Sequence, residues 1–132
     1  MILIDTSIWI DLLNGRVAGP DPDQILSVAT CGPIMQEVFQ GLREGGDAEA
    51  FRASFLALPF LSDPVPRSLY NAAGEIYRDG RRRGLTIRST IDCLIAAIAI
   101  EHGAVVWHRD RDFTAIARYT KLLQTTTWPF GR

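Results

Sequence analysis

The sequence is poor in the features that mark several large classes of protein. Its two cysteines, Cys31 and Cys93, lack CxxC spacing and nearby histidine, so we expect reduced core thiols of a cytosolic protein rather than a disulfide or a zinc site. No apolar run reaches the ~18 residues that a transmembrane helix needs. Residues 1–5 contain no basic residue and already include the charged Asp5, so no signal peptide is expected. We therefore expect one cytoplasmic domain over residues 1–132, with no membrane span.

Lysine is almost absent, because Lys121 is the only lysine among the 14 basic residues. A net charge of −1 and a pI of about 6.1 argue against a general electrostatic binder of nucleic acids. The arginines nevertheless gather in one short segment, which holds Arg78, Arg81, Arg82, Arg83 and Arg88. Such a run is commonly a solvated helix end, although arginine also suits bidentate contact with phosphate. Both interpretations stay open at this point.

The stretch from Ser89 to Phe113 organises the rest of the chain. Ser89 precedes Asp92 by three residues, as in a capping box with Asp in place of Glu, which predicts a helix start. Residues 91–100 are apolar except Asp92, and a helix that is apolar all round is buried on every side. Gly103 is expected to end this helix. Residues 104–107 then have the short, β-branched character of an interior strand in a parallel sheet.

The remaining chain alternates between strand and helix signals. A strand over 2–4 precedes a helix that Thr6 or Ser7 caps and that continues to Leu13. Asp23 is expected to cap a short helix over 24–29, Gly32-Pro33 starts another helix, and Asp47 caps a further one. The other expected elements are strands near 60–61 and 122–123 and helices over 67–83 and 113–119. This alternation predicts an α/β sandwich with a parallel sheet.

Acidic residues follow the expected strands and begin the expected helices. Asp5 ends the first strand, Asp110 and Asp112 follow the strand over 104–107, and Asp92 and Glu37 lie on helices. Each acid alone could be an ordinary turn or cap residue, but sites form where parallel strands end, so their coincidence favours one cluster. Clustered carboxylates repel one another strongly unless their pKa values rise or a divalent cation neutralises them.

The ligand types indicate which cation such a cluster would bind. His102 and His108 are interpreted as a helix-end cation and a surface residue, so the expected donors are all oxygens. Oxygen donors favour Mg²⁺ or Mn²⁺ over Zn²⁺. Such ions serve phosphate chemistry, which makes a phosphodiester the expected substrate.

Four motifs in this order resemble those of the PIN-domain ribonucleases. They are Asp5-Thr6-Ser7, Glu37 within residues 36–41, Asp92 within residues 90–97, and Asp110 within residues 108–113. The length and layout look like VapC-type toxins of bacterial toxin–antitoxin pairs. The resemblance implies a PIN-like α/β/α sandwich with a central, mainly parallel sheet of four to five short strands flanked by helices. It also implies a Mg²⁺- or Mn²⁺-dependent endoribonuclease that cuts structured RNA such as tRNA or rRNA.

The resemblance further implies partners and residue roles. A homodimer is expected, inhibited by a VapB-type antitoxin whose tail occupies the site. Asp5, Asp92 and Asp110 would be the main metal ligands, and Asp112 could complete a second metal site. Glu37 would bind metal through water or orient the nucleophile, and Ser7 could hold a metal-bound water. The one departure is His108, where family members usually have Asn or Thr. As a separate hypothesis, Arg81, Arg82, Arg83 and Arg88 contact the RNA backbone.

Two other classes of protein are alternatives to a PIN-domain ribonuclease. An Asp-based phosphotransfer domain needs paired acids at the first strand or Asp-x-Asp there, whereas Asp5 is followed by Thr6-Ser7. It also needs a basic residue near the site, and Lys121 falls too late in the chain. A catalytically silent PIN-like module that binds RNA or protein is the remaining alternative, and the presence of all four acids argues against it.

Overall fold

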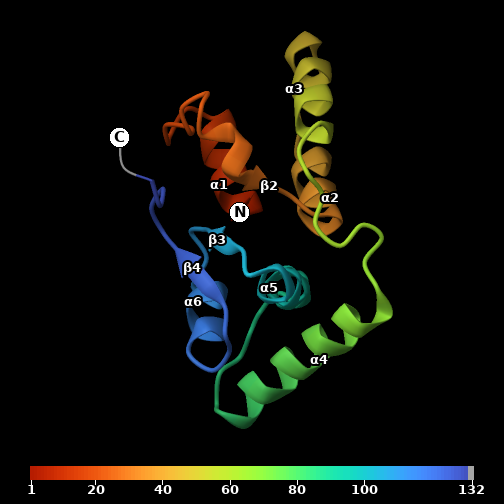
Figure 1. The fold of residues 1–132 in the computed structure, drawn as a ribbon, viewed down its shortest axis with the longest axis vertical. Coiled ribbons are helices and arrows are strands. Elements are labelled where there is room, and N and C mark those ends of the chain that lie inside the picture. The colour runs from red at the N-terminus through yellow and green to blue at the C-terminus, as the bar shows by residue number, and fades with distance from the viewer. Residues whose placement is uncertain (131–132) are drawn as a thin grey trace.

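A four-stranded parallel sheet forms the centre of the computed structural model, which describes residues 1–130 (Figure 1). The strands lie in the order β2 (Val28–Ala29), β1 (Ile2–Ile4), β3 (Val105–Trp107) and β4 (Leu123–Thr125). Leu3 pairs with Ala29 on one side and with Val106 on the other, which in turn pairs with Gln124. Because every pair is parallel, all four strands end at the same edge of the sheet. The expected parallel α/β architecture is confirmed.

Within residues 1–130, six α-helices and one short 3-10 helix connect and cover the strands. They are α1 (Thr6–Leu13), η1 (Ile25–Ser27), α2 (Gly32–Gln40), α3 (Gly46–Leu56), α4 (Arg67–Arg82), α5 (Thr90–His102) and α6 (Arg111–Ala117). Figure 1 shows α5 in the middle of the molecule, and it contacts α4, α2, α6 and β3. Among residues 1–130, none of these helices has both the length and the apolar character that crossing a membrane requires.

Helix α5 is the buried central helix that its apolar composition predicts. Cys93 to Ala99 are all buried, and Gly103 ends the helix in the left-handed conformation with φ 62°. The Ser89 side chain accepts a hydrogen bond from the Asp92 amide at 3.3 Å. The reciprocal half of the expected capping box is absent, because the Ser89 amide donates to the Asp112 carboxylate at 3.1 Å instead. Cys31 and Cys93 are buried free thiols, as expected.

Several expected local elements are wrong in detail. Asp5, rather than Thr6 or Ser7, caps α1, since its carboxylate accepts the Ser7 amide at 3.1 Å. Asp110 caps α6 in the same way and starts it at Arg111, earlier than expected. Helix α3 begins at Gly46, with Gly45 instead of Asp47 at the cap position. Aspartates next to a helix start are equally good candidates by residue type, so tertiary contacts decide between them.

The second strand also differs from the expectation. Val28 and Ala29, expected in a helix, form β2 because they pair with Ile2 and Leu3 of the buried strand β1. Phe60, expected in a strand, forms only a single bridge with Thr30. Short apolar runs suit a buried strand and a buried helix equally well, so the pairing partner is the deciding interaction.

Tyr119 links the end of α6 to helix α4. Its hydroxyl donates a hydrogen bond of 2.7 Å to the carbonyl of Ile76. We expect Tyr119→Phe to lower the free energy of unfolding by about 1 kcal/mol, since a largely buried acceptor loses its donor. Urea denaturation measures this change, and Tyr70→Phe, at an exposed tyrosine of α4, is the control. Equal losses in both variants would contradict the assignment.

Candidate active site

Three carboxylates converge at the edge where the strands end. Asp92 lies in the first turn of α5, Asp110 caps α6, and Asp112 lies in the first turn of α6. One side-chain oxygen of each residue falls within 4.8 Å of those of the other two. Asp92 and Asp112 are buried and Asp110 is half-buried. Residues separated by up to 20 positions in the sequence therefore form one acidic cluster.

Backbone amides hold two of these carboxylates in place. One Asp112 oxygen, Oδ2, accepts the amides of Arg88 and Ser89, both at 3.1 Å. Asp110 Oδ1 accepts the amide of Asp112 at 2.9 Å. The loop before α5 and the start of α6 are thus tied together, and each carboxylate keeps a second oxygen for another partner.

Asp92 is the least satisfied member of the acidic cluster. Burial and the neighbouring Asp110 carboxylate, with further repulsion from Asp5 and Asp112, raise its pKa to about 9. Its Oδ2 atom is buried and has no hydrogen-bond partner within residues 1–130. A buried oxygen without a partner is costly, and a hard divalent cation would satisfy it. The all-oxygen donor set and this orphaned atom both fit Mg²⁺ or Mn²⁺.

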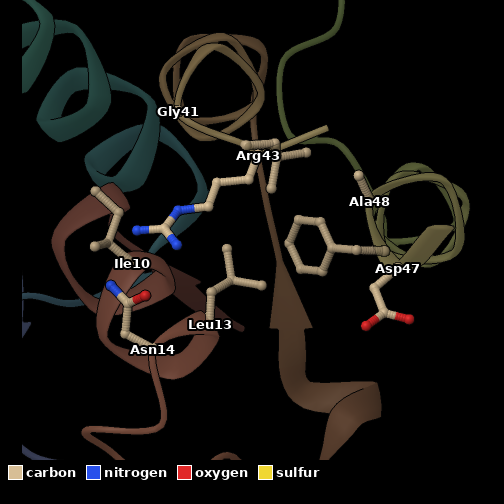
Figure 2. A pocket seen from close by; sticks show the side chains of 9 residues that line it. Ile10, Leu13, Asn14, Gly41, Arg43, Asp47 and Ala48 are labelled. Atoms are coloured by element: carbon tan, nitrogen blue, oxygen red, sulfur yellow. The ribbon is translucent and has the colours of Figure 1, made fainter. Parts of the chain in front are cut away.

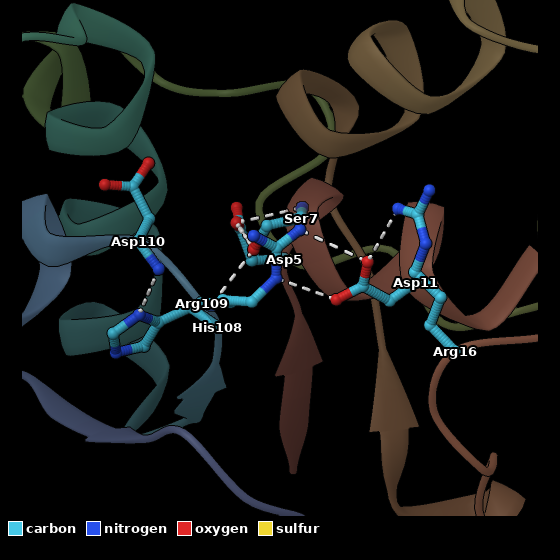
Figure 3. Close-up of polar contacts among 7 residues, drawn as sticks. All are labelled: Asp5, Ser7, Asp11, Arg16, His108, Arg109 and Asp110. Atoms are coloured by element: carbon cyan, nitrogen blue, oxygen red, sulfur yellow. Dashed lines mark hydrogen bonds and ion pairs between the residues drawn. The ribbon is translucent and has the colours of Figure 1, made fainter. Parts of the chain in front are cut away.

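Asp5, directly after β1, is held by Ser7 (Figure 3). The Ser7 hydroxyl donates to Asp5 Oδ2 at 2.7 Å and accepts the amide of Arg109 at 3.1 Å. Burial raises the pKa of Asp5, and the charge of Asp110 adds to the effect. Asp5 is not one of the three residues within 4.8 Å of one another, although its charge acts on Asp92. Ser7 thus joins the end of β1 to the loop after β3.

Glu37 on α2 lies close enough to Asp5 and Asp110 for their charges to interact with it. The Thr6 hydroxyl donates to Glu37 Oε1 at 2.9 Å. Partial burial raises the pKa of Glu37, and the charges of Asp5 and Asp110 contribute to the rise. Of the five acids that the sequence singled out, Asp92, Asp110 and Asp112 thus form the acidic cluster, and Asp5 and Glu37 lie near enough for their charges to interact with it. Thr6 was not predicted as part of the site, although it lies next to Asp5 in the sequence.

The arginines of the predicted RNA-contacting group do not lie together at the acidic cluster. Of the four, Arg88 lies at the acidic cluster, with its Nε atom 4.0 Å from Asp112 Oδ1. The others extend from the end of α4, where Arg82 pairs with Asp79 and Arg81 and Arg83 lie over the rings of Tyr77 and Tyr119. Three of the four arginines thus have partners at or beside the end of α4, and none of these partners belongs to the acidic cluster.

His108 is not the surface residue that we expected. It is fully buried; its Nδ1 atom accepts the amide of Asp110 at 3.0 Å, and its Nε2 atom lies 2.7 Å from Gln124 Oε1. The hydrogen bond from the Asp110 amide makes Nδ1 the acceptor, so Nε2 is the nitrogen that carries the hydrogen. The position directly after a buried strand was the available signal for burial.

A further ion pair beside the site was not predicted. Arg109 donates from Nε and Nη2 to the two oxygens of Asp11, at 2.8 and 3.2 Å (Figure 3). These hydrogen bonds lower the pKa of Asp11. The two residues are 98 positions apart, so no local pattern could have revealed the pair.

The fold and the acidic cluster together define an α/β domain whose carboxylates gather at the carboxyl edge of a parallel sheet. The PIN domain family model matches residues 2–119, and the chain belongs to this family. It is 41% identical over 131 residues to VapC ribonuclease Mb1587 of Mycobacterium bovis and to ribonuclease VapC11 of Mycobacterium tuberculosis. Each alignment covers 92% of this chain and 96% of the relative.

Solved structures of low sequence identity share the fold. VapBC2 from Rickettsia felis, bound to a promoter DNA fragment, aligns with a TM-score of 0.69 at 19% identity, covering 95% of this chain and 98% of that one. FitAcB from Neisseria gonorrhoeae aligns with a TM-score of 0.68 at 20% identity, covering 98% and 100%. The family resemblance inferred from the four motifs is confirmed.

Proposed function

We propose that this protein is a VapC-type endoribonuclease toxin that hydrolyses phosphodiester bonds of structured RNA such as tRNA or rRNA. The observation that carries the proposal is the convergence of Asp92, Asp110 and Asp112, with a buried Asp92 oxygen left unpartnered among the described residues. The two mycobacterial relatives named as ribonucleases support the same activity over nearly the full chain. We place the activity in the cytoplasm.

Mg²⁺ or Mn²⁺ is the proposed cofactor, held by Asp92 and Asp110 with Asp5, while Asp112 completes a second site. When bound, such an ion would activate water and stabilise the charge on the leaving oxygen. Ser7, fixed between Asp5 and the Arg109 amide, would hold an ion-bound water. The residues themselves set the donor geometry, because amides and hydroxyls orient the carboxylates before anything binds.

Glu37 is proposed to orient the attacking water and to accept its proton. Its carboxylate is half-buried and anchored through one oxygen by Thr6, which leaves the other for a water molecule. A raised pKa brings a carboxylate closer to the working pH of a general base. Arg88 is the arginine best placed to contact the RNA backbone at the cluster, and Arg81, Arg82 and Arg83 would extend that contact along α4.

A VapB-type antitoxin and a second copy of the chain are the proposed protein partners. A hollow of about 330 Å³ lies between α1, α3 and the loop after α2 (Figure 2). Ile10 and Leu13 line it and are 41% and 45% exposed, so they offer apolar contact to a partner. This hollow suits an apolar segment of the antitoxin, whose tail would continue to the acidic site.

The nuclease proposal is tested by incubating purified protein with total RNA and Mg²⁺ or Mn²⁺ and then mapping the new RNA ends. We expect cleavage at a small set of positions, and none in EDTA, because the carboxylates alone repel one another and phosphate. The same incubation with Asp23→Asn, at an exposed aspartate outside the cluster, should cleave normally. Absence of cleavage at every metal concentration would favour the catalytically silent PIN-like module.

A further inference from the structure

A separate cavity has Arg109 in its wall and none of the three carboxylates of the acidic cluster. It has a volume of about 320 Å³, within the range of small-ligand pockets. Its walls come from α1, the loop after α1, the end of β3 and the segment after β4. Arg109 is a wall residue, and the next residue in the chain is Asp110 of the cluster. The loop after β3 therefore contributes Arg109 to the cavity and Asp110 to the acidic cluster, and the Arg109 amide donates to the Ser7 hydroxyl beside Asp5.

The two charged residues that line this cavity, Arg109 and Asp11, form an ion pair with each other. Arg109 is held by two hydrogen bonds to the buried Asp11, and its side chain is 63% exposed. The guanidinium therefore offers a flat, fixed surface without a free positive charge. A phosphate or carboxylate would gain little here, whereas a planar neutral group can stack on a guanidinium.

Two tryptophans supply the other features that a planar ligand needs. The half-buried Trp128 ring is oriented by a 3.0 Å hydrogen bond from its Nε1 to Gln24. Trp107 lies against it, with ring centroids 5.2 Å apart, and is only 2% exposed. The Nε1 donor of Trp107 is buried and has no partner in the described part of the chain. That donor has almost no accessible surface, so the cavity offers a planar ligand aromatic contact rather than this hydrogen bond.

We infer that this cavity binds one unpaired base of the RNA substrate, at a nucleotide next to the scissile phosphate. Stacking on an aromatic ring or a guanidinium, combined with hydrogen bonds to the base edge, is the usual mode of single-stranded RNA recognition. Naming RNA as the source of the base rests on the proposed nuclease function. The cavity would then contribute to the choice of cleavage position.

Nuclear magnetic resonance of the indole N–H groups tests this inference without metal or cleavage. The ¹⁵N-labelled protein in EDTA is titrated with each of the four ribonucleoside 5′-monophosphates, and with ribose 5-phosphate as the matched probe that lacks a base. We expect the Trp107 and Trp128 signals to shift with at least one nucleotide below about 10 mM, since one stacked base gives weak affinity. Trp9, whose indole lies among Phe51 and Phe55, is the internal reference and should not move.

Two variants complete the experiment. Val17→Phe places a larger side chain in the cavity wall and should abolish the shift of Trp107, while Trp128→Phe keeps a stacking ring and should retain it. The inference is overturned if no nucleotide shifts the two signals, if ribose 5-phosphate shifts them equally, or if Val17→Phe leaves the shifts unchanged. Because nucleotide binding is read without cleavage, a failure here is distinct from a failure to find new RNA ends.

Discussion

Asp92→Asn is expected to reduce RNA cleavage by about a hundredfold to a thousandfold while raising the melting temperature of the metal-free protein. The amide cannot supply the anionic oxygen that a divalent cation requires. The substitution also removes a buried acid that must stay protonated at neutral pH in the folded state, because its pKa is about 9 there. Holding this proton lowers the free energy of unfolding, so its removal stabilises the fold. Loss of activity together with a gain in stability is typical of a functional residue and is not expected of a structural one.

The cleavage assay and thermal unfolding in EDTA measure the two effects of Asp92→Asn. Asp23→Asn removes one carboxylate of the same type from an exposed position and should change neither quantity. Addition of Mn²⁺ should raise the melting temperature of the wild type and of Asp23→Asn, but not that of Asp92→Asn. A variant that loses activity and stability together would identify Asp92 as a structural residue of α5.

The stability of the metal-free protein is expected to fall as pH rises from about 5 to about 9. In the unfolded chain Asp92 ionises near its ordinary pKa of 3.8, whereas the folded protein keeps it protonated up to a pKa of about 9. The folded state therefore binds one more proton between these values, so each pH unit removes up to about 1.4 kcal/mol. The raised pKa values of Asp5 and Glu37 act in the same direction.

A bound divalent cation should reverse this pH dependence, because it competes with the proton for the same oxygens. Thermal unfolding across this pH range, with EDTA or with Mn²⁺, gives both profiles. Asp92→Asn in EDTA should show a much flatter profile, and this comparison assigns the slope to one residue. A wild-type profile in EDTA that is flat or rises with pH would show that the three carboxylates do not share a proton-binding site.

The parts of the fold that follow from local chemistry were predictable from the sequence. The apolar run of α5, its Ser89 cap and Gly103 at its end each have a local physical cause, and all three are found in the structure. The convergence of the acids was predictable because parallel strands end at one edge, and the PIN motifs added the expected order. Strand β2 was not predictable in this way, because Val28 and Ala29 become a strand only through pairing with β1.

The surroundings of the acids were less predictable than the acids themselves. The Asp11–Arg109 pair, the burial of His108 and the use of Asp112 to accept the Ser89 amide all join distant segments. Capping rules identify which residue types can begin a helix, but not which of several neighbouring acids does so. Sequence patterns therefore identified the acids that gather in one cluster, and long-range hydrogen bonds determined how their carboxylates are held.

The central position of β1 has a consequence for the newly made chain. Residues 2–4 are synthesised long before residues 105–107, with which they form a parallel ladder, and Asp5 comes near Asp110 only when that ladder has formed. Contacts of such long sequence separation form late, after most of the polypeptide has left the ribosome. A ribosome-bound fragment that ends before Val105 has no complete acidic site, so the chain must be translated past Asp112 before the toxin can act.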